Sequence, residues 1–202
     1  MTPVTLSPHQ TPRARGFYFP ALAALLACLL AGPAQAQRQP SAEALRPPDV
    51  RYEPTPADVA EAMLQLAEVK PGDTVYDLGC GDGRIVIAAV RERHARGVCV
   101  DIDPQRIAES RENATAAGVG ERIVFLTQDL LATDVSGASV VMLFLSPALN
   151  LKIRSKLRRE LAPGARIVSH WHDMGDWRPQ RTLQIRSGGR ERAVYLWVIP
   201  GR

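Results

Sequence analysis

Cysteine is scarce in this chain of 202 residues, and its cysteine spacing matches no metal-binding pattern. The three cysteines are Cys28, Cys80 and Cys99. Only Cys80 and Cys99 lie beyond the N-terminal leader described below, and two cysteines do not make a disulfide framework. We therefore expect no metal ion, and we expect Cys80 and Cys99 to be small residues packed in a loop and in a strand.

A hydrophobic run long enough to span a membrane comfortably is also missing. The apolar stretch from Phe17 to Ala31 follows Arg13 and Arg15 and precedes Ala34-Gln35-Ala36. A short basic region, a short apolar core and an A-x-A site are typical of a secretory signal peptide. We predict that residues 1–36 are removed, so that the mature protein is periplasmic or secreted and has no stable membrane span.

Three alternatives to this cleavage stay open. The apolar stretch could be retained as a membrane anchor, or Cys28 could be lipidated, although Leu25-Leu26-Ala27 is atypical of a lipoprotein. A misassigned start near Val50 would instead make the protein cytoplasmic.

A large excess of charge of either sign is the third missing feature. The chain has 25 Lys and Arg against 21 Asp and Glu, and residues 1–36 contain two of the basic residues and none of the acidic ones. The remainder therefore has a net charge of +2. This balance gives no electrostatic reason to expect a nucleic acid as partner.

The chain does contain the length of one ordinary domain. Residues 37–50 are rich in proline and charge and show no periodicity, which predicts a linker. Residues 51–202 then form the predicted domain, and they contain no internal repeat.

A glycine-rich turn joins an apolar run to a helical pattern in this domain. The run from Thr74 to Leu78 predicts a buried parallel strand, and Asp77-x-Gly79-x-Gly81-x-Gly83 follows it into a helix. A dinucleotide site would need the spacing G-x-G-x-x-G. A carboxylate ahead of the glycines would repel a phosphate but would suit a cationic amino group, which weakens the interpretation as an NAD-type oxidoreductase.

Strands and helices alternate along the rest of the domain. Thr55 and Pro56 predict a helix start ahead of the first strand, with Thr55 as its N-cap. Further strands are predicted at residues 97–101, 122–126, 140–145 and 165–170. Residues 182–186 and 193–198, joined by Gly188-Gly189, predict a hairpin.

The motif from Asp77 to Gly83 resembles motif I of class I S-adenosylmethionine-dependent methyltransferases. The resemblance covers residues 51 to 200 and implies an α/β fold. It implies a Rossmann-like, seven-stranded sheet with helices on both faces, mostly parallel and with an antiparallel C-terminal hairpin. It also implies S-adenosyl-L-methionine as the cofactor.

The same resemblance implies which residues bind the cofactor. Asp77, Gly79 and Gly81 would lie at its methionine part, and Asp101 matches the position that binds the ribose. Asp103 competes for the ribose, but its place before Pro104 also suits an N-cap. Asp129 matches the residue that contacts the adenine amine, with Leu130 packed on the ring; the alternative for Asp129 is a turn aspartate.

Two further stretches are similar to non-SET, seven-β-strand protein lysine methyltransferases. One runs from Phe144 to Ser169, and the other is Tyr52-Glu53-Pro54-Thr55-Pro56. The ending Ser169-His170 with Asp173 to Trp177 resembles bacterial methyltransferase-domain proteins. Leu145-Ser146-Pro147-Ala148 replaces the Asn/Asp-Pro-Pro-Tyr/Phe sequence of DNA and glutamine methyltransferases, which disfavours methylation of a base amine. The resemblance implies an amine acceptor, which could be a protein lysine.

Methyl transfer to an amine requires an unprotonated nitrogen in line with the methyl carbon. Candidates for the acceptor site are Tyr52, Ser146, His170, His172 and Asp173. His170 could be the base or a structural histidine, and the three tryptophans could belong to the core, a lid or a substrate cage. A small-molecule N- or O-methyltransferase and a non-catalytic cofactor-binding module remain as alternatives.

Overall fold

The structure is a computed structural model that describes residue 47 and residues 52–201. The predicted signal peptide and nearly all of the predicted linker therefore lie outside the described residues. Within the described residues, no helix is long and apolar enough to cross a membrane.

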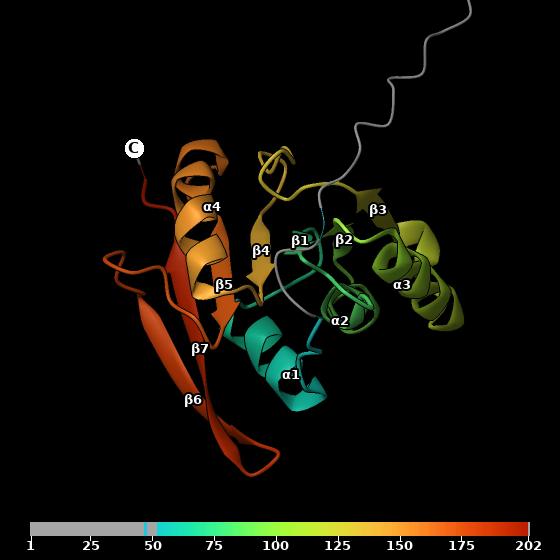
Figure 1. Cartoon of the computed structure of the whole chain (residues 1–202), viewed down its shortest axis with the longest axis horizontal. Coiled ribbons are helices and arrows are strands. Elements are labelled where there is room, and N and C mark those ends of the chain that lie inside the picture. The colour runs from blue at the N-terminus through green and yellow to red at the C-terminus, as the bar shows by residue number, and fades with distance from the viewer. Residues whose placement is uncertain (1–46, 48–51, 202) are drawn as a thin grey trace, which may run out of the picture. The chain divides into compact units, whose positions relative to one another are not determined.

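One sheet of seven strands organises the described part of the chain, with the order β3-β2-β1-β4-β5-β7-β6 (Figure 1). The parallel strands are β1 (Thr74–Leu78), β2 (Arg96–Asp101), β3 (Ile123–Thr127), β4 (Val140–Leu143) and β5 (Arg166–His170). β6 (Arg181–Ser187) and β7 (Arg190–Val198) form the hairpin, and β7 is antiparallel to β5. The predicted fold class, including the antiparallel ending, is confirmed.

Helices cover both faces of this sheet (Figure 1). They are α1 (Ala57–Leu66), α2 (Arg84–Arg93), α3 (Pro104–Ala116) and α4 (Pro147–Glu160), with a short 3₁₀ helix at Gly120–Arg122. Side chains alternate along a strand, so Val141 and Leu143 of β4 pack in the core on the α4 side. Val140 and Met142 pack in the core formed with α1 and α2.

The predicted start of α1 is wrong in one detail. Pro56 occupies the N-cap position and has no side chain that caps the helix. The Thr55 hydroxyl is instead buried and lies 3.3 Å from Nδ1 of His170, which follows in the sequence 115 residues later. A long-range partner has thus replaced the local hydrogen bond that the sequence predicts.

The carboxyl ends of the parallel strands share one edge of the sheet, which is where open α/β folds bind ligands. The β6–β7 hairpin extends past this edge. His170, the last residue of β5, pairs with Val194, so residues 190–193 of β7 continue beyond β5. The hairpin therefore reaches the region where a ligand is expected.

Candidate cofactor and acceptor site

A pocket of about 670 Å³ opens at the carboxyl edge of the sheet. Part of its lining comes from residues at and after the ends of β1, β2, β3 and β4. The lining also includes Tyr52–Thr55, Trp171, His172, Arg190 and Arg192. All six predicted cofactor residues are close to one another at this edge, and five of them, Gly81 being the exception, line the pocket directly.

The glycine loop after β1 bends over the end of β2. The N–H groups of Gly79 and Cys80 both donate to the carbonyl oxygen of Val100, over 2.8 and 3.0 Å. Gly81 has a φ of +55°, and a Cβ at this position would overlap the ring of Tyr52. Only a glycine meets both demands, because it accepts positive φ and has no side chain.

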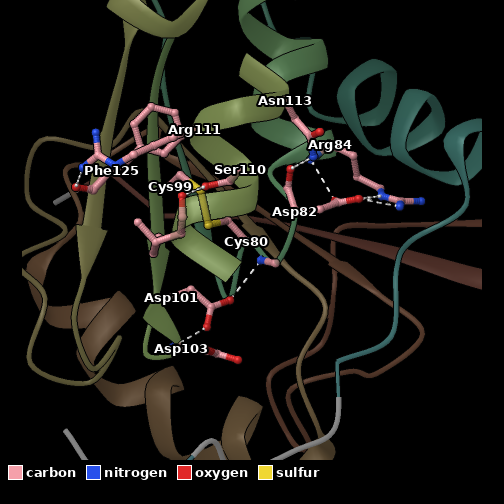
Figure 2. The surroundings of a disulfide bond; sticks show 12 residues. Cys80, Asp82, Arg84, Cys99, Asp101, Asp103, Ser110, Arg111, Asn113 and Phe125 are labelled. Atoms are coloured by element: carbon pink, nitrogen blue, oxygen red, sulfur yellow. Dashed lines mark hydrogen bonds and ion pairs between the residues drawn. A yellow bond between two sulfur atoms is a disulfide. The ribbon is translucent and has the colours of Figure 1, made fainter. Parts of the chain in front are cut away.

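Asp101 is fixed against this loop. Its Oδ2 accepts a hydrogen bond of 2.9 Å from the Gly81 N–H, and its Oδ1 accepts one of 3.0 Å from the Asp103 N–H (Figure 2). Asp103 caps α3, because its Oδ1 accepts from the Gln105 N–H over 2.8 Å. The capping alternative for Asp103 is thus observed, while the Asp101 carboxylate joins the glycine loop to the end of β2.

Asp77 is the most buried acid of the pocket, with 2% of its surface exposed. Burial and the nearby Asp101 raise the pKa of Asp77 to about 7. Its Oδ2 has no hydrogen-bond partner among the described residues. A buried carboxylate oxygen without a partner, in a pocket, fits the cationic amino group of S-adenosylmethionine.

Asp129 and Leu130 line the pocket after β3. The Asp129 Oδ1 accepts a hydrogen bond of 2.8 Å from the Leu131 N–H, so the carboxylate does take part in the predicted turn. This bond and an adenine contact are compatible, since a carboxylate has two oxygens and several acceptor positions. Leu130 is 8% exposed and contributes an apolar wall.

The acceptor-site candidates separate when the structure places them. Tyr52, Ser146 and His172 line the pocket, whereas His170 and Asp173 do not. Ser146 caps α4 by accepting from the Leu149 N–H over 3.3 Å. Asp173 accepts from the Gly175 N–H over 3.0 Å.

Burial and the neighbouring Asp82 raise the pKa of Tyr52, which keeps its hydroxyl protonated.

His170 is fully buried and is held at both ring nitrogens. Nε2 lies 3.4 Å from Nη1 of Arg192, and Nδ1 lies 3.3 Å from the Thr55 hydroxyl. A guanidinium can only donate, so Nε2 is the acceptor and Nδ1 carries the hydrogen. Burial and the Arg192 charge lower the pKa of His170 to about 4, so the ring is neutral at physiological pH.

The three tryptophans have different roles. Trp197 is fully buried, and its Nε1–H donates to the Trp177 carbonyl oxygen over 2.7 Å. Trp171 is 41% exposed, lines the pocket and has a φ of +70°. Such a conformation costs about 1–3 kcal/mol for a residue other than glycine and must be imposed by its surroundings.

Asn150 of α4 imposes the path of the chain around Trp171. Its Nδ2 donates to Ser169 Oγ and to the carbonyl oxygens of His172 and Asp173, over 3.0 to 3.2 Å. No pattern in the sequence indicates this role, because the hydrogen-bond partners of Asn150 lie about twenty residues further along the chain. The role of Arg192 was missed in the same way, because the hairpin contains several arginines.

Cys80 and Cys99 form a disulfide, with their Cα atoms 5.4 Å apart (Figure 2). The prediction that they are merely small packed residues is wrong. Cys99 lies beside β1 in the sheet, and the bend of the glycine loop over β2 returns Cys80 to it. The signal available in the sequence was that Cys80 lies just after one predicted strand and Cys99 lies near the end of the next, both at the edge where a ligand is expected.

A second set of interactions fixes the outer part of the loop. The Asp82 carboxylate pairs with the guanidinium of Arg84, at 2.6 Å for the Nη2–Oδ2 contact. Arg84 Nη1 also donates to the Thr55 carbonyl oxygen over 3.0 Å. The glycine loop and the segment before α1 are therefore joined across the pocket. Among the described residues, no cluster of three or more His, Cys, Asp or Glu could hold a metal ion.

Comparisons with known proteins agree with this architecture. The ANTKMT methyltransferase domain family matches residues 77–181. The chain is 40% identical over 153 residues to a protein-lysine N-methyltransferase of Saccharolobus islandicus, which covers 75% of this chain and 95% of that protein. It is 32% identical over 130 residues to the adenine nucleotide translocase lysine N-methyltransferase of Mus musculus, covering 64% of this chain and 56% of that protein.

A solved structure is similar over the same region. The crystal structure of an RNA methyltransferase from Salinibacter ruber, in complex with S-adenosyl-L-homocysteine, superposes with a TM-score of 0.71. The two chains are 46% identical, and the similarity covers 74% of this chain and 95% of the other. The unpartnered Asp77 oxygen supports S-adenosylmethionine as the cofactor, and so does the S-adenosyl-L-homocysteine bound to that relative, since it is the product of methyl transfer from S-adenosylmethionine. This chain belongs to the ANTKMT methyltransferase domain family and is a class I S-adenosylmethionine-dependent methyltransferase.

Proposed function

We propose that this methyltransferase transfers a methyl group to the side-chain amine of a protein lysine. The observation that carries the proposal is the similarity to the Saccharolobus islandicus protein-lysine N-methyltransferase, which extends over 95% of that protein. The aromatic residues Tyr52, Phe144 and Trp171 line the pocket and suit the long alkyl part of a lysine.

We assign the cofactor residues as follows. Asp77 binds the α-amino group, the backbone at Gly79 and Gly81 lies along the methionine part, and Asp101 accepts from the ribose hydroxyls. Asp129 binds the adenine amine, and Leu130 packs on the ring. S-adenosylmethionine supplies a methyl group bonded to a positively charged sulfur. The support for this arrangement is that Asp77, Asp101 and Asp129 all line one pocket at the carboxyl edge of the sheet.

A second candidate acceptor is RNA, because the Salinibacter ruber relative is described as an RNA methyltransferase. Two observations favour the lysine. The chain beyond residue 36 has a net charge of only +2, and Leu145-Ser146-Pro147-Ala148 follows β4 in place of a sequence that grips a planar base amine. Small-molecule amines remain a further outcome of the experiment below.

We also propose that the protein acts outside the cytoplasm. The basic and apolar leader with its A-x-A site supports export. The disulfide supports it as well, because such bonds persist mainly in oxidising compartments.

Turnover on a cell extract with methyl-labelled S-adenosylmethionine tests the acceptor. We expect label that protease releases and ribonuclease does not, and methyl-lysine after acid hydrolysis. Label released by ribonuclease would favour the RNA candidate, and label in small molecules would favour the third. Binding of S-adenosylhomocysteine without any turnover would favour the non-catalytic module. Asp77→Asn is the matched control, since it should weaken cofactor binding and so lower turnover on every acceptor.

A further inference from the structure

Arg192 lines the pocket from the part of β7 that extends beyond β5, beside the aromatic ring of Trp171. Its guanidinium carbon lies 5.3 Å from the centroid of the Trp171 ring, and its Nη1 contacts the buried His170. Its Nε is buried and has no hydrogen-bond partner among the described residues. No acidic side chain forms an ion pair with Arg192 in the described part of the chain. A positive charge is therefore held at the pocket wall without a neutralising partner.

His170 contacts Arg192 and is itself held by two other segments. His170 accepts from Arg192, donates to Thr55 and stacks on Phe144 with their ring centroids 4.1 Å apart. Both nitrogens of His170 are thus in use, and neither can take a proton from an incoming amine without losing a contact. His170 is consequently a positioning residue rather than a base.

Methyl transfer to a lysine requires that the acceptor amine lose its proton in the pocket. A free lysine side chain titrates at about 10.4, so the acceptor arrives with a proton that must leave before the nitrogen can attack. A nearby positive charge and removal from water both favour the neutral amine over the ammonium. Arg192 supplies the positive charge, and the aromatic side chains of Tyr52, Phe144 and Trp171 supply an apolar lining for the amine.

We propose that Arg192, held in place by His170, favours the neutral form of the acceptor lysine by charge repulsion, so that methyl transfer proceeds without a general base. The ammonium releases its proton to water at the exposed mouth, near Tyr52 and Glu53. The nitrogen lone pair then forms the bond to the methyl carbon, and the carbon–sulfur bond breaks with its electron pair left on sulfur. The product is a methylated ammonium. This inference rests on the proposed lysine acceptor.

Other charged or titratable groups face the same end of the pocket. Glu53 is exposed and attracts the ammonium before it enters, while Asp82 is neutralised by Arg84. Arg190 adds a second positive charge from β7. Burial lowers the pKa of His172, which favours the neutral imidazole, and His172 lines the pocket, so it is an alternative acceptor for the lysine proton. The experiment must separate His172 from Arg192.

Arg192→Gln and Arg192→Lys test the proposal through the pH dependence of methylation. Initial rates of label incorporation into extract protein are measured between about pH 6 and 10. In the wild type, the rate should rise with pH as the acceptor amine loses its proton. We expect Arg192→Gln to shift this rise to a pH about one unit higher, so that the rate is about tenfold lower at neutral pH and recovers at high pH. Arg192→Lys keeps the charge and should keep the wild-type profile. Calorimetry should show unchanged binding of S-adenosylhomocysteine in both variants.

Arg186→Gln is the matched control, because Arg186 is exposed on β6 of the same hairpin and does not line the pocket. An Arg192→Gln profile identical in shape to the wild type overturns the proposal. Loss of the rising limb in His172→Gln also overturns it, since that residue would then be the base. Absence of any label in protein with the wild-type enzyme contradicts the proposed function instead.

The disulfide carries a second inference, from an independent observation. Cys80 lines the pocket between two glycines with positive φ, and Cys99 lies two residues before Asp101 on β2. The covalent bond and the hydrogen bond from Gly81 to Asp101 therefore tie the same loop to the same strand end (Figure 2). Without the bond, a loop with three glycines has more conformations to lose when ligand binds.

We infer that affinity for the cofactor depends on the oxidised state of Cys80–Cys99. A dithiol reductant supplies two electrons and two protons, which gives two thiols and the reductant's own disulfide. Calorimetry with S-adenosylhomocysteine should show severalfold weaker binding after reduction. The number of free thiols per molecule should rise by two in the same sample. Cys80→Ala/Cys99→Ala should bind as weakly as the reduced wild type and should not respond to reductant. Equal affinity in both redox states, or no disulfide in the purified protein, overturns the inference.

Discussion

Asp101 and Asp103 are two residues apart, yet their side chains accept hydrogen bonds from different parts of the chain. Asp101 receives hydrogen bonds from Gly81 and Asp103, whereas Asp103 caps α3. We predict that Asp101→Ala weakens binding of S-adenosylhomocysteine by about 1.5–3 kcal/mol, the value of hydrogen bonds to a charged group. Asp103→Ala should instead lower stability by about 0.5–2 kcal/mol, as loss of an N-cap does. Calorimetry and thermal unfolding separate the two, and equal losses of affinity would refute the assignment.

Asp77 predicts a pH dependence of binding. Its pKa is raised to about 7 in the free protein, because it is buried near Asp101. The folded protein therefore holds a proton that the unfolded chain has released, and this contribution to stability is lost as pH rises from about 4 to about 7. A cationic amino group favours the charged carboxylate, so cofactor binding at pH 6 should release a proton.

Calorimetry at pH 6 in buffers of different ionisation enthalpy measures this proton release. Asp77→Asn should abolish the release and weaken binding, and it should remove the fall in stability of the free protein as pH rises toward 7. An unchanged proton count in the variant would show that the proton comes from another group.

At the scale of single elements, the glycine loop offers a steric test. A side chain at Gly81 would meet the Tyr52 ring and would need a φ of +55°. We predict that Gly81→Val abolishes measurable cofactor binding and lowers stability by about 1–3 kcal/mol while the domain still folds. Gly120→Ala is the control, because Gly120 lies outside this pocket with only ordinary contacts around its Cβ position. Normal binding by Gly81→Val would mean that the cofactor lies elsewhere.

The sequence predicts elements well where the determinants are local. The apolar run before Gly79 and the glycine pair at 188–189 fixed β1 and the hairpin correctly, because their periodicity and turn residues lie within a few positions. Thr55 failed as an N-cap because its partner is His170, far along the chain. Hydroxyl groups can satisfy either a local or a distant partner, and only the fold decides between them.

The disulfide and the Arg192–His170 contact could not be predicted from the sequence, because both depend on how the strands pair. The disulfide depends on the neighbours β1 and β2 and on the bend of the loop over Val100. The contact between Arg192 and His170 at the pocket depends on the pairing of β5 with β7. Both are contacts between separate segments, and no spacing within one segment encodes them. Asp77, Asp101 and Asp129 were expected to lie close together, because each is at or just after the carboxyl end of a predicted strand, and these ends share one edge of the sheet.

At the scale of the whole molecule, the proposed export and the cofactor pose a conflict, because S-adenosylmethionine is made in the cytosol. A start at Met63 would not resolve it, since α1 would lose Val59, Ala60 and Ala62 from its buried face. If the protein is exported, then either S-adenosylmethionine is supplied outside the cytosol or the domain binds a related ligand without turnover. The turnover experiment above distinguishes these outcomes.

We predict export and cleavage after Ala36. N-terminal sequencing of the natural protein should find a chain that begins at Gln37, because the A-x-A site ends at Ala36. Thiol trapping of the same sample should find Cys80 and Cys99 already joined, since an oxidising compartment forms the bond and the cytosol keeps thiols reduced. A chain that begins near Val50 with two free thiols would refute export. The pocket would then operate in its reduced form, and the affinity measured after reduction would be the one that matters in the cell.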